Sequence, residues 1–318
     1  MTSPNAPTLA DVARQAGVST ATVSRCLNEP ERVRRETRER VEAVVARLGY
    51  TPHFGARALA SNRTNTVGAV IPTMENAIFA LAIQTMEREL SAAGVTLFVA
   101  TSNYDAEREA EQIRALTGRG VDGLILIGRE RPEATYRYLK ERAARVVLVW
   151  ASQAGAPHPC VGFDNRAAAR SMAERVIARG HRRVAMIAGV TAGNDRATER
   201  VEGVRAALAA AGAPLAPDML IETEYAAAAS AEAAKRLMRA AAPPTAILCG
   251  NDVQAAGALK GLRALGLSVP GDVSVVGFDD IELASAVEPE LTTVHVPHRR
   301  MGRAAAKAVL RLRNGGEP

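Results

Sequence analysis

Two different spacings of apolar residues divide the chain near residue 64. Before this point, apolar positions recur every three or four residues, which is the spacing of one face of an α-helix. After it, short apolar runs rich in β-branched residues alternate with Ala-rich stretches of helical spacing. The first pattern predicts a small helical domain, and the second predicts strands that alternate with helices.

The helical part opens with a short amphipathic helix that is marked at both ends. Its apolar face consists of Leu9, Val12, Ala13 and Ala16. Thr8 precedes this face and can cap the helix through its hydroxyl, with Asp11 three residues later in a capping-box arrangement. Gly17 follows the face, and glycine ends helices because it adopts the left-handed conformation without a Cβ penalty.

A second helix is predicted directly after this turn. Ser19 can cap it, and Val23 and Leu27 face back onto the first helix. Its outward-facing residues are Thr20, Ala21, Ser24 and Arg25. Small outward side chains let a helix enter the major groove of DNA, where an arginine can bond guanine bidentately. Ser19, Thr22 and Asn28 are short groups suited to phosphate oxygens. The pair is typical of a helix-turn-helix, although two helices alone are equally compatible with a hairpin in a larger core.

A third helix and a linker complete the N-terminal part. The helix is expected over residues 35–48, and its packing face consists of Val41, Val44, Val45 and Leu48. Gly49 ends it, and Tyr50 is expected to pack back on the helices. Residues 51–62 favour one more short helix that is unstable alone, because Gly55 costs about 1 kcal/mol relative to Ala and short isolated helices are marginal. A plain linker is the alternative for this segment.

The second pattern predicts an α/β region from Asn65 onward. Strands are expected at 67–71, 95–100, 123–127, 146–150, 184–188, 246–249 and 273–278. Helices are expected near 79–93, 105–118, 132–143, 165–179, 197–211, 229–241, 253–265 and 299–313. Short buried strands that alternate with helices predict parallel sheets covered on both faces, and the span is long enough for two lobes. Ligands bind beyond the carboxyl ends of such strands, so two facing lobes form a cleft.

Charge and hydropathy narrow the classes of partner. The 318-residue chain has a formal net charge of +6, and 47% of its residues are hydrophobic. Residues 1–63 hold ten Arg against six Asp and Glu, so four of the six excess positive charges lie in one fifth of the chain. This distribution suits a nucleic-acid partner. The sequence shows no signal-peptide pattern and no apolar run of membrane-spanning length, so we expect a cytoplasmic protein without a membrane partner.

Candidate metal, cofactor and catalytic motifs are weak. The cysteines are Cys26, Cys160 and Cys249, an odd number without disulfide or metal spacing. Residues 118–123 read G-x-G-x-x-G, but a dinucleotide fingerprint must follow a strand and open a helix, and this one follows a predicted helix. His158, His295 and His298 lack partners at ligand spacing. We therefore expect no metal, no cofactor and no catalytic residue.

Residues 10–28, ADVARQAGVSTATVSRCLN, resemble the DNA-binding segment of the LacI/GalR family of bacterial regulators. Further family-like stretches are VDGLIL (121–126), VGFDN (161–165), RGHRRVAMIAG (179–189), PTAILCGND (244–252), VPGDVSVVGFDD (269–280) and PELTTV (289–294). The resemblance implies an N-terminal all-α helix-turn-helix domain plus an α/β periplasmic-binding-protein-like effector domain of two doubly wound lobes.

The resemblance also implies domain boundaries. These are residues 1–50 for the helix-turn-helix domain, 51–64 for a hinge helix, and 65–318 for the effector domain, with lobe 1 at about 65–162 and 294–318 and lobe 2 at about 163–293. In the family, two hinge helices pair across a homodimer and push a Leu into the minor groove, and Leu59 matches that Leu. The chain departs from the family pattern at two positions. Gly55 lies where Val is common, and Arg34 lies where a capping Ser or Thr is usual. No tetramer-forming leucine heptads follow, so a dimer is expected.

Two sets of site residues follow. The expected DNA contacts are Thr8, Ser19, Thr20, Ala21, Thr22, Arg25, Asn28, Arg57 and Leu59. The expected effector contacts, which match family positions, are Phe79, Trp150, Arg200, Tyr225, Asn251 and Asp279. Polar groups at strand ends with aromatic rings nearby suit a hydroxylated small molecule. Loop or core packing is the alternative role for each of these side chains. Residues 161–185 look most similar to gluconate-type members, which hints at a sugar acid.

The sequence therefore predicts a sequence-specific DNA-binding transcriptional regulator, most simply a repressor. Its expected partners are double-stranded operator DNA, a second copy of the chain, and a sugar or sugar-acid effector held between the lobes. A solute-binding receptor without a DNA role is the alternative, and the basic N-terminal part argues against it. An enzyme ranks third, because no nucleophile–base pair is visible.

Overall fold

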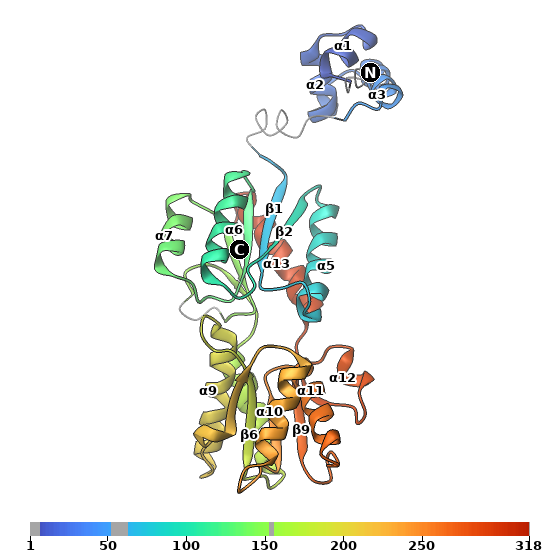
Figure 1. Cartoon of the computed structure of the whole chain (residues 1–318). Helices are drawn as coiled ribbons and strands as arrows, with labels where there is room; N and C mark the ends of the chain where they lie inside the picture. Colours follow the sequence, from blue (N-terminus) through green and yellow to red (C-terminus); the bar gives the residue numbers. More distant parts are fainter. Residues whose placement is uncertain (1–6, 52–62, 153–155, 318) are drawn as a thin grey trace, which may run out of the picture. The chain divides into compact units, whose positions relative to one another are not determined.

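The computed structural model describes residues 7–51, 63–152 and 156–317. The chain divides into two compact units, residues 1–64 and residues 65–318 (Figure 1). Arg57, Leu59 and Gly55 lie outside the described residues, so the predictions made for the hinge stay predictions. Among the described residues, none of the helices has the length and apolar composition that a membrane span requires.

The first unit is a three-helix bundle. Its elements are α1 (Leu9–Ala16), α2 (Thr20–Asn28), the 3-10 turn η1 (Pro30–Arg32) and α3 (Arg35–Leu48). The predicted capping box is present, since the Thr8 hydroxyl accepts from the Asp11 N–H and the Asp11 side chain accepts from the Thr8 N–H. Gly17 and Gly49 end α1 and α3 in the left-handed conformation. Arg34 provides no side-chain cap for α3.

The bundle core is small and largely aliphatic. Its buried members are Val12, Ala13, Ala16, Val23, Cys26, Val41, Val44 and Tyr50. Cys26 belongs to this core although helical spacing assigned the inner face of α2 to Val23 and Leu27. Leu27 packs against the same cluster while partly exposed. The outward side chains of α2 stay exposed at Thr20, Ala21 and Arg25.

The second unit contains two lobes, each built on one parallel five-stranded sheet. The first sheet has the order β2-β1-β3-β4-β5 and the second has the order β10-β9-β8-β6-β7. Strands of the first are β1 (Thr66–Ile71), β2 (Thr96–Thr101), β3 (Gly123–Ile127), β4 (Val146–Val149) and β5 (Cys160–Val161). Strands of the second are β6 (Val184–Gly189), β7 (Leu220–Thr223), β8 (Ala246–Cys249), β9 (Ser274–Asp279) and β10 (Thr292–His295). All pairings are parallel.

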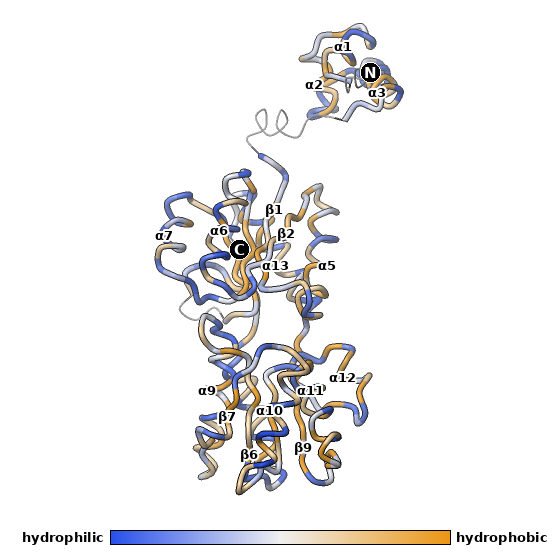
Figure 2. Tube along the Cα trace, viewed as in Figure 1, coloured by the Kyte–Doolittle hydropathy of each residue, from blue (hydrophilic) through white to orange (hydrophobic). Residues whose placement is uncertain are grey.

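Helices cover both faces of each sheet. The helices are α5 (Ala77–Ala92), α6 (Ala106–Gly118), α7 (Glu133–Glu141), α8 (Asn165–Ala178), α9 (Asp195–Ala210), α10 (Ala227–Met238), α11 (Asp252–Ala264), α12 (Leu283–Ala286) and α13 (His298–Arg313), with the 3-10 turn η2 (Pro217–Met219). Apolar strands run through the middle of each lobe, and in the first lobe the hydrophilic stretches of α6 and α7 lie at the outside (Figure 2). The predicted fold class, two doubly wound lobes after a helix-turn-helix, is confirmed.

Successive side chains of a strand point to opposite faces of the sheet, so the buried residues of each strand are divided between two core clusters. In β4, Val147 and Val149 pack in the cluster shared with α5 and α13, while Val146 and Leu148 pack in the cluster under α6 and α7. A fully buried parallel strand needs apolar residues on both sides, which explains why these strands appear as continuous apolar runs.

The pattern of apolar residues missed the short elements at the sheet edges. The strands β5, β7 and β10 and the helix α12 were not expected, because these short elements contain no run of four buried apolar residues, whereas β4 and β8, with four residues each, do. These three strands lie at sheet edges, and their side chains are only partly buried or exposed. Since β10 extends to His295, residues 294 and 295 belong to the second sheet, and the chain returns to the first lobe slightly later than residue 294.

The chain crosses between the lobes twice in this unit. It leaves β5 and enters α8 through residues 162–164, and it leaves β10 and enters α13 through residues 296–297. Gly162 lies so close to the backbone of Ala151 that a Cβ at this position would overlap the Ala151 carbonyl oxygen and nitrogen. The first crossing therefore requires the absence of a side chain at this residue.

Candidate functional site

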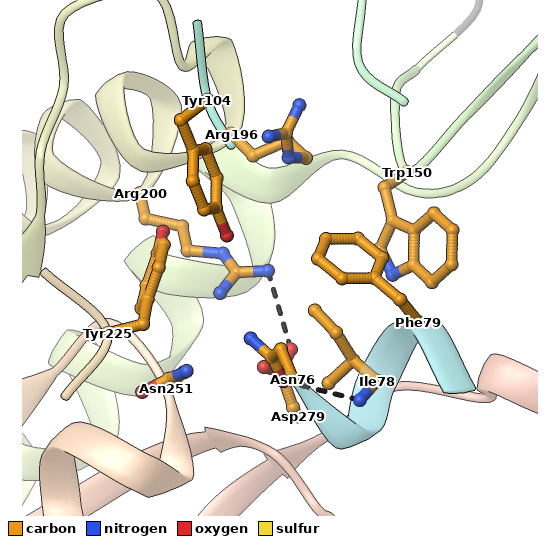
Figure 3. A pocket seen from close by; sticks show the side chains of 10 residues that line it. All are labelled: Asn76, Ile78, Phe79, Tyr104, Trp150, Arg196, Arg200, Tyr225, Asn251 and Asp279. Atoms are coloured by element: carbon orange, nitrogen blue, oxygen red, sulfur yellow. Dashed lines mark hydrogen bonds and ion pairs between the residues drawn. The ribbon is translucent and has the colours of Figure 1, made fainter. Parts of the chain in front are cut away.

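A small cavity lies between the two lobes. It is lined by Asn76, Ile78, Phe79, Tyr104 and Trp150 from the first lobe and by Arg196, Arg200, Tyr225, Asn251 and Asp279 from the second (Figure 3). The structure thus brings together all six side chains that the sequence suggested for effector contact. Their position at one cavity follows from the topology, because each comes after a strand or at the start of the helix that follows it.

Helix starts bring polar groups to the cavity from both lobes. Asn76 caps α5 by accepting from the Ile78 N–H at 3.3 Å, and Asn251 caps α11 by accepting from the Gln254 N–H at 2.8 Å. Arg196 and Arg200 lie in the first two turns of α9. Three helix N-termini with their partial positive charge therefore lie at the cavity, which favours electronegative groups on a ligand.

Arg200 is held rigidly in the wall of the second lobe. Its Nε donates to Asn165 Oδ1 at 3.0 Å, and its Nη1 donates to the Gly250 carbonyl at 2.6 Å. The centre of the guanidinium lies 3.7 Å from the centre of the Phe278 ring, a cation–π contact. The side chain is only 6% exposed, so its geometry is fixed before any ligand arrives.

Asp279 is the acidic group of the cavity. It ends β9 in the second lobe and is 1% exposed. Burial raises the pKa of its carboxyl to about 7, and the nearby Arg200 guanidinium partly opposes this rise. Behind it, His298 Nε2 donates to the Asp279 carbonyl at 3.1 Å, and burial lowers the pKa of His298 to about 4, so the imidazole is neutral at pH 7.

Aromatic rings line the cavity on both sides. Phe79 and Trp150 from the first lobe meet edge to face, with 5.3 Å between ring centres. Tyr104 from the first lobe contacts Tyr225 from the second, with 5.9 Å between ring centres. Trp150 Nε1 is buried and has no hydrogen-bond partner among the described residues. It is a donor that a ligand oxygen can satisfy.

Several cavity residues have a backbone conformation that side chains seldom adopt. The φ angles are +61° at Tyr104, +60° at Trp150 and +106° at Asp279. Left-handed backbone at non-glycine residues costs of order 1–3 kcal/mol and persists where the surrounding structure enforces it. Its occurrence at three residues that line one cavity supports a functional role for that cavity.

Sequence reasoning missed three contributors to this site. Tyr104 follows β2, and the rule that ligands meet strand ends would have found it. Arg196 stands one helical turn before Arg200, so helical spacing would have found it. Asn165 lines no cavity but donates to the Trp150 carbonyl at 3.0 Å while accepting from Arg200, and nothing in its local sequence marks this bridge between the lobes.

The N-terminal unit presents a second candidate surface on α2. Arg25 is exposed on this helix, and in the described part of the chain it forms no ion pair, whereas Arg32 pairs with Glu29 at 2.8 Å. The Ser19 hydroxyl caps α2 by accepting from the Thr22 N–H at 3.1 Å, and the Asn28 amide donates to the Ser24 carbonyl at 2.9 Å. These polar groups therefore shape the helix ends as well as facing solvent.

Comparison with known proteins decides what these two units are. The sequence-family model for bacterial regulatory proteins, lacI family, matches residues 8–53. The family model for the periplasmic binding protein-like domain matches residues 173–318. Catabolite control protein A of Priestia megaterium is 32% identical over 307 residues, covering 96% of this chain and 92% of that protein. The chain belongs to the lacI family of bacterial regulatory proteins. It is a DNA-binding transcriptional regulator with an effector-binding domain.

Two further comparisons extend over nearly the whole lacI-family chain. The HTH-type transcriptional repressor PurR of Erwinia tasmaniensis is 34% identical, with 95% of this chain and 89% of that protein covered. The structure of the Lac repressor dimer bound to operator and the anti-inducer ONPF has a TM-score of 0.86 at 27% identity, covering 97% of this chain and 93% of that one. The LacI resemblance predicted from residues 10–28 is thus confirmed.

Proposed function

We propose that this lacI-family regulator is a cytoplasmic repressor that binds a pseudopalindromic operator as a homodimer. Its DNA binding is regulated by a small effector in the cavity between its lobes. The observation that carries the proposal is that one cavity collects ten side chains from both lobes, including Arg200, Asn251 and Asp279. A ligand that contacts both lobes has different affinities for closed and open forms. It therefore shifts the balance between them without any bond being made or broken.

The lining favours a compact hydroxylated effector, a sugar or a sugar acid. Asn76, Asn251 and the Trp150 N–H offer polar groups around the cavity, and Arg200 next to Asp279 offers a donor and an acceptor side by side. Phe79 with Trp150 offers apolar ring surface for the C–H face of such a molecule. The roles of Phe79, Trp150, Arg200, Tyr225, Asn251 and Asp279 as effector contacts are part of this proposal.

On DNA, α2 lies in the major groove with Thr20, Ala21 and Arg25 at base edges. Exposure of these three residues and the lack of an ion pair at Arg25 within the described chain support this arrangement. The groups assigned to phosphate oxygens are Thr8, Ser19, Thr22 and Asn28. Arg57 and Leu59 complete the proposed contacts in the minor groove. The alternative function, a solute-binding receptor without a DNA role, does not explain the family match over residues 8–53.

The experiment is selection of bound sequences from random duplex DNA at a stated salt concentration, with and without a panel of sugars, sugar acids and nucleobases. We expect a palindrome whose binding is lost or gained with one compound. The same selection is carried out with the variant Arg200→Ala, which should select the same palindrome but should not respond to that compound. Salt-sensitive binding without sequence preference would contradict the proposed operator, and turnover of the bound compound would favour an enzyme.

A further inference from the structure

A second contact between the lobes lies beside the effector cavity, where the turn after β3 meets the first turns of α9. The first lobe contributes Gly128 and Arg129, and the second contributes Asp195, Arg196 and Glu199. We call these five residues the lobe latch. Only Arg196 is shared with the cavity lining, and its guanidinium points away from Arg200 and Asp279 (Figure 3).

The latch is held by a carboxylate that faces both lobes. Asp195 Oδ2 accepts from the Arg129 N–H at 2.7 Å, and Asp195 Oδ1 accepts from Arg196 Nη1 at 2.9 Å. The Arg129 guanidinium also pairs with Glu199 across the lobes, with 2.5 Å between Nη2 and Oε1. Two cations meet two carboxylates, so the contact joins the lobes without an excess charge.

Partial burial strengthens these contacts relative to an ordinary surface pair. The side chains of Asp195 and Glu199 are 10% and 14% exposed, and that of Arg129 is 34% exposed. Charge-assisted bonds screened by little water contribute more than exposed ion pairs. On its outer side the latch borders an open hollow, whose lining includes Arg129, Glu199 and Glu202.

The latch also depends on the absence of a side chain at residue 128. A Cβ at Gly128 would overlap Arg196 Nη1 and Asp195 Oδ1, and the φ angle of Gly128 is +69°. The two lobes therefore approach this closely only because residue 128 is glycine. Lobe closure and the position of Arg196 are coupled through the same few atoms.

We propose that the lobe latch holds the effector cavity closed in the absence of a ligand, and that Asp195 is a positioning residue that ties Arg196 to lobe closure. The effect on effector affinity rests on the function proposed above, whereas the effect on closure does not. An effector that contacts both lobes binds the closed form. When the latch is lost, the apparent affinity for the effector therefore falls in proportion to the fraction of molecules that remain closed.

The test uses Trp150, which is the single tryptophan of the sequence and is 1% exposed in the cavity. Its fluorescence quenching by acrylamide in the full-length, ligand-free protein reports opening without any effector. We expect Asp195→Asn and Gly128→Ala to raise the quenching constant at least twofold. Glu202→Gln is the matched control, because Glu202 pairs with Arg166 within the second lobe, and it should leave quenching unchanged.

A charge swap separates a latch from a general loss of folding. Glu199→Arg alone should open the cavity, and Arg129→Glu with Glu199→Arg should restore most of the protection of Trp150. Far-UV circular dichroism and thermal unfolding identify variants that fail to fold. Wild-type quenching in folded Asp195→Asn and Glu199→Arg would overturn the latch. If quenching changes as expected but no compound binds, the latch stands and the proposed effector role fails.

Discussion

Arg200 and Asp279 form an ion pair in the wall of the cavity, with 3.5 Å between Nη2 and Oδ1 and with side chains 6% and 1% exposed. The pair comes from α9 and the end of β9, 79 residues apart in the sequence. Such a buried pair contributes little to net stability, but loss of one partner leaves the other charge uncompensated. The pair therefore fixes the chemistry of the cavity more than it stabilises the lobe.

The first prediction concerns this pair. Arg200→Met should lower the free energy of unfolding at pH 7 by about 1–3 kcal/mol, because two buried acceptors, Asn165 Oδ1 and the Gly250 carbonyl, lose their donor. The pKa of the Asp279 carboxyl should rise further without its cation. Arg200→Met with Asp279→Asn should recover part of that loss, since no buried charge remains. Urea unfolding of the two variants measures the difference. Equal losses in the single and double variants would show that the pair is not coupled.

The second prediction concerns the pH dependence of stability. The folded pKa of Asp279, about 7, is raised above its unfolded value of 3.8, so the folded state binds more protons between these pH values. The contribution of this group is fully present below pH 4 and is lost as pH rises through 7, by at most about 1.4 kcal/mol per pH unit. Asp279→Asn should remove this decline. The measurement is the difference between the wild-type and variant unfolding curves at pH 5, 6, 7 and 8.

The third prediction concerns base reading by α2. Arg25→Ala should cost about 1–3 kcal/mol on the selected operator and relax specificity at one base pair. Arg14→Ala is the control, because Arg14 is exposed on α1 and pairs with Asp11. Fluorescence anisotropy with operators varied at each position measures both effects. Equal weakening on every sequence would make Arg25 a phosphate contact instead.

The fourth prediction concerns the uncapped start of α3. Arg34 forms no side-chain cap, and its backbone, with φ −57° and ψ 138°, is not helical. Arg34→Ser should therefore stabilise the N-terminal unit by about 0.5–2 kcal/mol relative to Arg34→Ala. Thermal unfolding of the two variants provides the comparison. If Arg34 also contacts phosphate, both variants should weaken operator binding to the same extent.

The fifth prediction concerns the first crossing between the lobes. Gly162→Ala should destabilise the second unit by about 1–3 kcal/mol, because its Cβ would overlap the Ala151 backbone. Gly118→Ala should be neutral or stabilise by up to about 1 kcal/mol, since Gly118 ends α6 and no other atom lies near its added Cβ. Calorimetry on both variants tests the contrast. A stable Gly162→Ala protein would show that this crossing can shift.

Much of the fold was predictable because the strong signals are local. Thr8, Asp11 and Gly17 delimit α1 by capping chemistry alone, and the apolar runs of β1 and β3 identify buried parallel strands. The edge strands β7 and β10 were not predicted, because they are strands through their pairing with a neighbouring strand and not through their composition. Cys26 was missed for a related reason, since only the packing of three helices buries it.

The two-unit organisation, the helix-turn-helix and the strand ends at which a ligand can bind follow from the amino-acid sequence alone, because helix caps and the spacing of apolar residues depend on neighbours in the chain. The link that Asn165 makes between Trp150 and Arg200, and the hydrogen bond from the Arg129 N–H to Asp195, depend instead on how the chain folds. The raised pKa of Asp279 likewise depends on the folded chain, since burial of its carboxyl produces it. These features require residues far apart in sequence to lie within a few ångströms, and no local pattern encodes that distance.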